Sequence, residues 1–406
     1  MTTDLRIRII PAMSEIPVDV WDACANPVAA KQQIYKLEPR AGNEAAYNPF
    51  VSHDFLSSLE LSGSAVARTG WQPQHLVAET AAGAVVGVAP CYLKSHSRGE
   101  YVFDRGWAEA YEQAGGSYYP KLQVSVPFTA ATGRRLLARR GEHMNHVHEA
   151  LADGLIALCR LRQASSVHVT FMPEDECRLL AARGYLPRTD QQFHWENAGY
   201  ATFDDFLNAL AARKRKSIRR ERREALADGI EVEWLTGAGL TEAVWDDFFT
   251  FYMETGARKW GRPYLTREFY SLIGEKMANR ILLVMAKRAG RYIAGAINFI
   301  GSETLFGRHW GAIEHHPFLH FELCYYQAIE YAIAHKLRRV EAGAQGEHKL
   351  ARGYLPVTTH SAHYIADPAL KRAIAEYLVR ERAYVAAAGR EMAGLAPFRK
   401  DRDEEE

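Results

Sequence analysis

Apolar and polar residues alternate in the same way near the start of the chain and again past its middle. Residues 5–10 (LRIRII) and 230–235 (IEVEWL) place apolar side chains at every second position, which predicts a half-buried β-strand. Each strand is followed by a loop and then by Val-Trp-Asp, beginning at Val20 and at Val244, which opens a predicted helix. The two tryptophans lie 224 positions apart (245 − 21), so strand, loop and helix recur together.

The segments that follow also match between the two halves. Two apolar runs joined by Ala-Gly predict a β-hairpin in each half, with the turns at Ala82-Gly83 and Ala289-Gly290. Apolar residues at helical spacing then predict a helix, and an apolar run predicts a strand after it. The helices are predicted over 147–162 and 321–336, and the strands over 167–172 and 338–345.

One hexapeptide, ARGYLP, occurs twice, at residues 182–187 and 351–356. The copies are 169 positions apart (351 − 182), and each is followed at the same distance by a His-aromatic pair, His194-Trp195 and His363-Tyr364. Identity at the same place in two matching series of elements indicates a duplicated domain. We expect the two ARGYLP turns to superpose, each leading into the last strand of its sheet.

The chain is therefore predicted to be an α/β (α+β) protein of two tandem duplicated domains, each a mixed, twisted sheet flanked by helices. A length of 406 residues suits two cores, and 48% hydrophobic residues are enough to fill them. The predicted divisions are 1–200 for the first domain, 201–229 for a basic linker helix, 230–366 for the second domain and 367–406 for a C-terminal helix and charged tail.

Cysteine usage and the absence of long apolar runs predict a cytoplasmic protein. The five cysteines are an odd number without a CxxC pair, which favours reduced thiols over disulfides or a zinc site. The first residues, MTTDLRIRIIPAM, have no apolar signal segment, and no apolar run approaches the length of a membrane span.

Charge is concentrated in one predicted helix. The net charge of +1 argues against a generally basic nucleic-acid binder, but residues 213–223 hold eight basic residues and one acid, a sum of +7 that leaves −6 for the rest of the chain (1 − 7). A solvated helix face would explain such a run. We favour an anion-binding role toward tRNA phosphates, a lipid pyrophosphate or an anionic membrane surface, carried by Arg219, Arg220, Arg222 and Arg223.

The order of strand, hairpin, strand, helix, strand, closed by CRLLAARGYLPR, resembles the GNAT acyltransferase fold. Two such domains joined by KRKSIRRERREALADGIEVEW, a basic helix that leads into a strand, resemble the FemAB family. Stretches such as NPFVSHDFLSSLE, HSRGEYVFDRGWA, FGRHWG and EAGAQGEHKLARGYLP are similar to an uncharacterised bacterial branch of that family. The resemblance implies tandem GNAT-like domains that transfer an amino acid from aminoacyl-tRNA to a peptidoglycan precursor.

The densest polar stretch after an apolar strand is EAGAQGEHKLARG, residues 341–353. Ligands favour the edge where strands of an α/β sheet end, and acylation of an amine needs a base and anion-holding groups. The predicted catalytic residues are Glu341, Glu347 and His348, and the predicted substrate-binding residues are Gln345, Lys349 and Arg352. Solvated loop charges and a structural ion pair are the alternative, and Arg183 at the repeat-equivalent position of Arg352 supports a fold role for that arginine.

Further substrate contacts are predicted around residues 307–323 and in the block 95–121. Arg308, His320 and Glu322 precede or open a helix, where capping is the alternative role for the last two. No glycine lies between Gly311 and that helix, which disfavours a coenzyme A phosphate turn, and no carboxylate spacing supports a metal site beside the histidines. The predicted substrate groove of the block contains His96, Glu100, Tyr119 and Lys121, although its aromatic residues also suit a core.

These features together predict an acyltransferase that acylates an amine in a cleft between the domains. The donor is aminoacyl-tRNA or acyl-CoA, and the acceptor is a small molecule or a peptide resembling a cell-wall precursor. Without a Ser-His-Asp arrangement, direct attack of the amine is preferred over an acyl-enzyme. Two alternatives remain open: an acyl-CoA-dependent N-acetyltransferase, and a non-catalytic binding protein that kept the fold.

Overall fold

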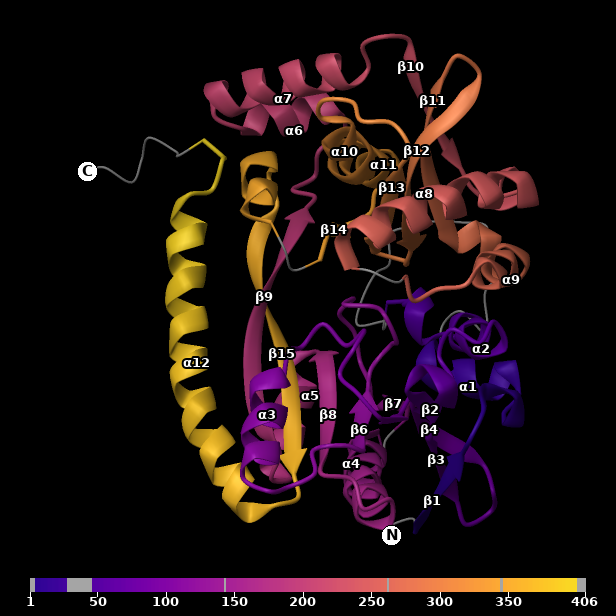
Figure 1. Cartoon of the computed structure of the whole chain (residues 1–406), viewed down its shortest axis with the longest axis vertical. Helices are drawn as coiled ribbons and strands as arrows, with labels where there is room; N and C mark the ends of the chain where they lie inside the picture. Colours follow the sequence, from indigo (N-terminus) through magenta and orange to yellow (C-terminus); the bar gives the residue numbers. More distant parts are fainter. Residues whose placement is uncertain (1–3, 28–45, 142–143, 261–262, 344–345, 400–406) are drawn as a thin grey trace.

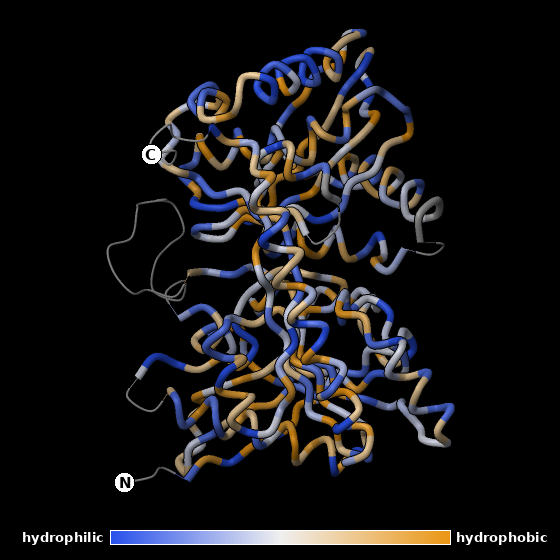
Figure 2. The backbone as a smooth tube through the Cα atoms, turned by 90° about the vertical axis from the view of Figure 1, so that its left-hand side faces the viewer, coloured by the Kyte–Doolittle hydropathy of each residue, from blue (hydrophilic) through white to orange (hydrophobic). Residues whose placement is uncertain are grey.

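The computed structural model describes residues 4–27, 46–141, 144–260, 263–343 and 346–399. They form two lobes, one above the other along the long axis, joined by long strands in the middle (Figures 1 and 2). The lower lobe in Figure 1 is built mainly from the first half of the sequence and the upper lobe mainly from the second half.

The first half contains the following helices and strands: β1 (Leu5–Ile10), α1 (Val18–Ala25), α2 (His53–Leu61), β2 (Trp71–Pro73), β3 (His75–Thr80), β4 (Val85–Ala89), β5 (Tyr92–Lys94), α3 (Arg105–Gln113), β6 (Lys121–Val124), β7 (Leu137–Ala138), α4 (Met144–Leu161), β8 (Ser166–Met172), α5 (Glu174–Ala182) and β9 (Leu186–Glu196).

The remainder begins with two linker helices and then repeats the plan: α6 (Phe203–Ala209), α7 (Ala212–Ala225), β10 (Ile230–Leu235), α8 (Glu242–Trp260), α9 (Arg267–Met277), β11 (Ile281–Arg288), β12 (Arg291–Ile300), β13 (Thr304–Ala312), α10 (Leu319–Phe321), a π-helical segment (Glu322–Tyr326), α11 (Gln327–Ala334), β14 (Arg339–Glu341), a 3₁₀ helix (Glu347–Arg352), β15 (Leu355–Ile365) and α12 (Pro368–Gly394). Short 3₁₀ turns lie at Met13–Glu15, Pro49–Val51, Ala67–Thr69, Gly237–Gly239 and Ala278–Arg280.

One sheet of eleven strands runs through both halves, in the order β10-β11-β12-β13-β14-β9-β15-β8-β6-β5-β2. Its two central strands, β9 and β15, are the strands that follow the two ARGYLP turns. They are antiparallel neighbours (Figure 1). β9 belongs to the first half in sequence but pairs with β14 of the second half, and β15 pairs with β8 of the first half. Each half is thus completed by the last strand of the other.

The pairing of β9 with β15 has the register of a two-fold axis. Asp190 faces Thr359, and these residues are 169 positions apart (359 − 190), the same offset as the two ARGYLP copies. Leu186 faces His363 and His194 faces Leu355, so equivalent positions face each other at equal distances from the centre. The sequence predicted a duplication, and the topology confirms it. The prediction that each turn leads into the last strand of a sheet of its own was wrong, because β9 and β15 lie together at the centre of one shared sheet.

The two ARGYLP turns have the same hydrogen bonds at their glycine and tyrosine residues. Gly184 and Gly353 take φ angles of +85° and +88°, a region that suits glycine, which has no Cβ. In each turn the glycine N–H donates to the carbonyl three residues back and the tyrosine N–H to the carbonyl five residues back. The hydroxyls of Tyr185 and Tyr354 donate to Ala152 and Tyr325, on the helix of their own half. The motif recurs because β9 and β15 must leave their turns in equivalent directions to pair with each other.

A second contact relates the halves in the same way. α2 and α9 begin at the N-caps Ser52 and Thr266, whose hydroxyls each accept a hydrogen bond from an amide three residues on. Phe55 and Phe269, three residues after these caps, pack against each other with ring centroids 5.7 Å apart. They belong to one hydrophobic core shared by both halves. The lobes are therefore joined by a sheet and by a common core. The domain boundaries at 200, 229 and 366 stay predictions.

Two sequence predictions are corrected by local geometry. The linker predicted as one helix over 201–229 is two helices, because Leu210 leaves the helix with an extended ψ of 153° and pairs with Phe398. The first-half hairpin forms as predicted, but Pro90 interrupts its second strand. As a result β3 and β4 join a separate four-stranded sheet, β1-β3-β4-β7, while β2 and β5 stay in the large sheet.

α12 lies along both exchanged strands on the left of Figure 1. Asp367 caps its first turn, and Leu370, Ile374 and Leu378 are buried in a core with Trp107. Among the described residues, no helix is long and apolar enough to cross a membrane.

A buried pair of histidines marks where β15 enters the first half. The Nδ1 atoms of His168 and His363 are 2.7 Å apart, so one ring donates a hydrogen bond that the other accepts. Burial, reinforced by the positive charge of Lys121, lowers the pKa of His168 to about 3. Burial, with His168 beside it, also lowers the pKa of His363.

We expect this pair to make the fold labile to acid. In the unfolded chain a histidine titrates near pH 6.5, so between about pH 6.5 and pH 3 the unfolded state binds protons that the folded pair does not. The free energy of unfolding should fall with pH in this window, by up to about 1.4 kcal/mol per pH unit for each histidine. Urea unfolding at pH 7, 6 and 5 measures this, and His168→Gln should flatten the slope whereas His315→Gln, which removes an exposed imidazole, should not. A stability independent of pH would contradict the assignment.

Candidate functional site

The candidate site begins where two parallel strands of the second half separate. β13 and β14 pair only over Thr304–Phe306 and Arg339–Glu341. β13 then continues to Ala312, whereas β14 ends. At the same place β13 carries a β-bulge, with Arg308 and His309 opposite the single residue Ile297 of β12. A bulge re-aims side chains, and here it turns polar residues toward the opening between the strands.

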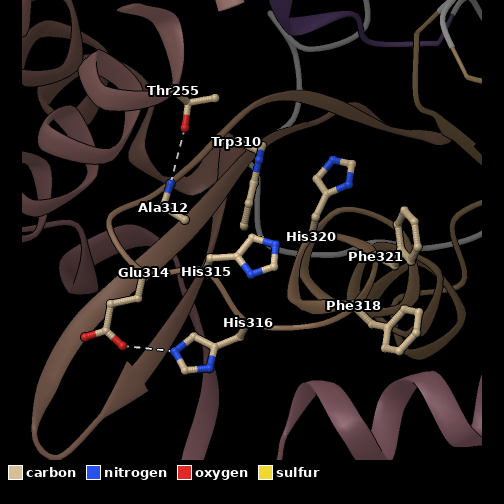
Figure 3. Close-up of a pocket in the computed structure, with 9 residues that line it drawn as sticks. All are labelled: Thr255, Trp310, Ala312, Glu314, His315, His316, Phe318, His320 and Phe321. Atoms are coloured by element: carbon tan, nitrogen blue, oxygen red, sulfur yellow. Dashed lines mark hydrogen bonds and ion pairs between the residues drawn. The ribbon is translucent and has the colours of Figure 1, made fainter. Parts of the chain in front are cut away.

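Two adjoining cavities occupy this opening. The inner cavity, about 170 Å³, is lined by Asn298, Arg308, His309, Cys324, Tyr325 and Ala342 among others. The outer cavity, about 360 Å³, is lined by Ala312, Glu314, His315, His316, Phe318 and Phe321. Both include Thr255, Trp310 and His320, so they form one continuous site. Figure 3 shows Trp310, His315 and His320 gathered between the end of β13 and the helix that begins at Leu319.

A π-helical segment forms the wall of the inner cavity. Residues 322–326 interrupt an otherwise continuous helix and place Cys324 and Tyr325 on the cavity side. Such segments are rare and are frequent at functional sites. Burial raises the pKa of Tyr325, so its phenol stays protonated at neutral pH.

The charges of the site are unevenly distributed. At the outer rim, Glu314 is paired with Arg288 and with His316. In the inner cavity, burial and the neighbouring Arg308 lower the pKa of His309 to about 3, so this imidazole is neutral. Burial also lowers the pKa of Arg308. A guanidinium still stays protonated at neutral pH, and Arg308 is the only arginine or lysine among the described residues that line the inner cavity.

The equivalent opening in the first half is filled by protein. There β6 and β8 run parallel and pair over three residues each, as β13 and β14 do. Arg135 is fully buried beyond them and donates to the carbonyls of Thr170 and Ala131. The carboxylate of Glu176 accepts hydrogen bonds from the amides of Arg135 and Leu136. The duplication therefore produced two equivalent places between parallel strands. Buried side chains of the described residues, such as Arg135, occupy the first, and a cavity lies at the second.

The predicted base Glu341 faces the first half. Its carboxylate accepts hydrogen bonds from the amide and the hydroxyl of Thr132, and it lies 4.0 Å from Nε2 of His194. It is buried and is not among the residues that line the inner cavity, although the next residue, Ala342, is. The geometry favours a contact between the halves over a role as base.

Polar side chains of the turn after β14 are bonded to the turn itself and to neighbouring helices. Lys349 donates to the carbonyls of Ala342 and Gly343, and burial lowers its pKa to about 8. Arg352 pairs with Glu221 at 2.8 Å. His348 is exposed and lies 3.0 Å from the hydroxyl of Tyr325. The predicted Gln345 and the side chain of Glu347 lie outside the described residues.

Of the residues predicted around the helix start, His320 and Arg308 line the site and Glu322 does not. Glu322 is fully buried and pairs with Arg222 at 2.9 Å. Gln327 also donates to it. Arg222 is bound to Glu330 as well, so this arginine of the predicted anion-binding set supports the fold.

The other predicted anion-binding arginines, Arg219, Arg220 and Arg223, are exposed on α7. Arg219 pairs with Asp204, and Arg220 lies 3.6 Å from Glu224. The Arg220 guanidinium also lies 6.0 Å from the ring of Phe318, which lines the outer cavity. The basic helix therefore adjoins the mouth of the site.

The predicted groove of the first half is a buried polar network. Lys121 is fully buried and pairs with Glu100 and Asp104, and Tyr119 bonds to Ser97. Burial, with Lys94 and Arg98 nearby, lowers the pKa of His96 to about 4. None of the four predicted residues is among the lining of the two cavities in the described part of the chain.

Sequence reasoning missed Thr255, Asn298, Trp310, Cys324 and Tyr325 as lining residues. Each lies within a helix or strand whose apolar pattern indicates core. Trp310 stood in a quoted motif, FGRHWG, without a role. A break in hydrogen bonding between strands leaves no local signal in the sequence.

Comparison with known proteins assigns the family. A family model described as peptidoglycan biosynthesis/recognition, FemAB-like, matches residues 12–400. The chain belongs to the FemAB-like family. No curated protein matches it significantly. The tandem GNAT-like fold predicted from the sequence is confirmed.

Two solved structures have the same fold at low identity, and a third is similar in part. L-PGS from Bacillus licheniformis is 9% identical, with 82% of this chain and 98% of that chain covered and a TM-score of 0.50. The C-terminal domain of a putative lysylphosphatidylglycerol synthetase from Agrobacterium fabrum is 8% identical, with 91% and 97% covered and a TM-score of 0.51. A structure of FemX is 13% identical, with 78% and 93% covered and a TM-score of 0.49.

We expect Arg222→Gln to destabilise the protein by about 3–5 kcal/mol, because it leaves the buried carboxylate of Glu322 without its cation. Arg219→Gln is the matched control on the same helix, since its ion pair is exposed and its loss should change stability by less than about 0.5 kcal/mol. Urea unfolding followed by circular dichroism measures both. Equal effects of the two substitutions would show that Arg222 is as dispensable as its neighbour.

Proposed function

We propose that this FemAB-like protein is an acyltransferase that acylates an amine in the site between β13 and β14. The observation that carries the proposal is the separation of these parallel strands over a cavity that contains Arg308 and His320. A gap between parallel strands exposes main-chain groups that can hold an extended acyl chain or peptide. The family description, peptidoglycan biosynthesis/recognition, supports a peptide resembling a cell-wall precursor as the acceptor.

The donor we favour is aminoacyl-tRNA, with acyl-CoA as the alternative. Both carry phosphates, and the exposed arginines of α7 adjoin the outer cavity through Arg220 and Phe318. This arrangement suits a polyanion that lies along α7 while its acyl end enters the cavity. Both donors occur in the cytoplasm, where we place the protein. Its five cysteines are unpaired, in agreement with a reducing compartment.

The chemistry is a direct transfer. The acceptor ammonium must lose a proton before its nitrogen attacks the ester or thioester carbonyl. A C–N bond then forms, and the C–O or C–S bond to the donor breaks. We propose that His320 is the base that accepts this proton, because its side chain lines both cavities, where donor and acceptor must meet. The neutral His309 with its pKa of about 3 is too weak a base for this step.

The test is a transfer assay with labelled aminoacyl-tRNA and acyl-CoA pools and a peptidoglycan-precursor peptide as acceptor. The wild type should label the peptide, and His320→Gln should lower kcat/KM by about a hundredfold or more, the contribution of general-base catalysis. His315→Gln is the matched control, since it removes a histidine from the outer cavity alone. No transfer from either pool would favour a non-catalytic binding protein, and full activity of His320→Gln would refute its role as base.

A further inference from the structure

Arg308 comes from the second half but is surrounded by groups of the first half. Its position in the bulge of β13 brings it to the inner cavity and also to the apolar contact between the halves. One guanidinium N–H donates to the carbonyl of Phe128 at 2.5 Å, and the side chain is also hydrogen-bonded to Tyr101. The guanidinium carbon lies 5.9 Å from the ring centres of both Phe50 and Tyr101.

The two residues that hold Arg308 have unusual backbones. Tyr101 and Phe128 have φ angles of +62° and +58°, a left-handed region that residues with side chains rarely adopt. Their segments are tied together by a hydrogen bond of 3.1 Å from the Phe128 amide to the Gly99 carbonyl. A Cβ at Gly99 would lie 2.5 Å from the Phe128 ring. Strained backbone of this kind persists where the surroundings enforce it, and it is concentrated at functional sites.

The charge of Arg308 is incompletely balanced. The charge of Glu341 acts on Arg308, but the hydrogen bonds of this carboxylate go to Thr132, and no described carboxylate forms an ion pair with Arg308. No carboxylate is among the described residues that line the inner cavity. A guanidinium has five N–H donors in a planar fork, and the contacts with Phe128 and Tyr101 leave donors for a ligand in the cavity. Carboxylate and phosphate oxygens are the groups that this fork binds best.

We propose that Arg308 is an anion-binding residue and that Tyr101 and Phe128 of the first half are positioning residues that aim its guanidinium into the inner cavity. The ligand is a carboxylate or phosphate group carried by the donor or the acceptor. The assignment of this anion to a substrate rests on the proposed function, which it makes more specific. The site of the second half is therefore incomplete without the loops of the first.

The experiment measures binding of acetate and of inorganic phosphate to the full chain by titration calorimetry, at constant ionic strength set with chloride. The wild type should bind at least one of them at a single saturable site, and the tighter of the two identifies a carboxylate or a phosphate as the natural group. Arg308→Gln should weaken binding about tenfold or more, and Tyr101→Phe, which removes only a hydroxyl, about threefold with an unchanged Tm. Arg288→Gln is the charge-matched control at the outer rim and should bind within about twofold of the wild type.

Non-saturable binding in the wild type, or equal affinity in the wild type and Arg308→Gln, would overturn the proposal. Equal affinity in Tyr101→Phe would overturn the positioning role. If Arg308→Gln does not fold, Arg308→Lys replaces it: weaker binding supports the planar fork, and unchanged binding contradicts it. Saturable anion binding without transfer from any donor would refute the proposed function alone, whereas transfer without anion binding would refute this inference alone.

Discussion

The antiparallel pairing of β9 with β15 is the constraint on which the rest of the structure depends. Each strand extends from its own turn into the sheet of the other half, and Asp190 faces its repeat equivalent Thr359 at the centre. Removing either strand would leave unpaired main-chain groups in both lobes, so neither lobe has a complete sheet alone. The repeated ARGYLP turn follows from this: two strands related by a two-fold axis need the same entry angle, which the same glycine and tyrosine contacts provide.

Within this symmetric frame the halves have diverged in what fills the gap between their parallel strands. Arg135 and Glu176 are bonded to main-chain groups beside the gap of the first half, whereas the bulge at Arg308 and the π-helical segment border the cavity of the second. The first half still contributes to the open site, because its loops contact Arg308 and Glu341. One half supplies the cavity and the other fixes the residues around it.

Local patterns predicted the elements well and their partners poorly. Alternation, helical spacing and Ala-Gly turns identified the hairpins, the helices and the duplication, because these depend on neighbours in sequence. The exchange of β9 and β15 was not predictable, since either strand could have completed its own sheet with the same pattern. Glu341 was predicted as a base because it ends a strand, but its partner Thr132 is 209 positions away (341 − 132). Glu322 and Arg222 were likewise predicted to bind ligands, but in the structure they form an ion pair with each other.

Native-state hydrogen exchange followed strand by strand tests the central claim, that the exchanged strands make both halves one cooperative unit. We expect the amides of β8, β9, β14 and β15 to open with the same free energy, within about 1 kcal/mol, and this value should equal the free energy of global unfolding. If the strands of one half open at a lower free energy while those of the other stay protected, the halves fold independently and the account is wrong.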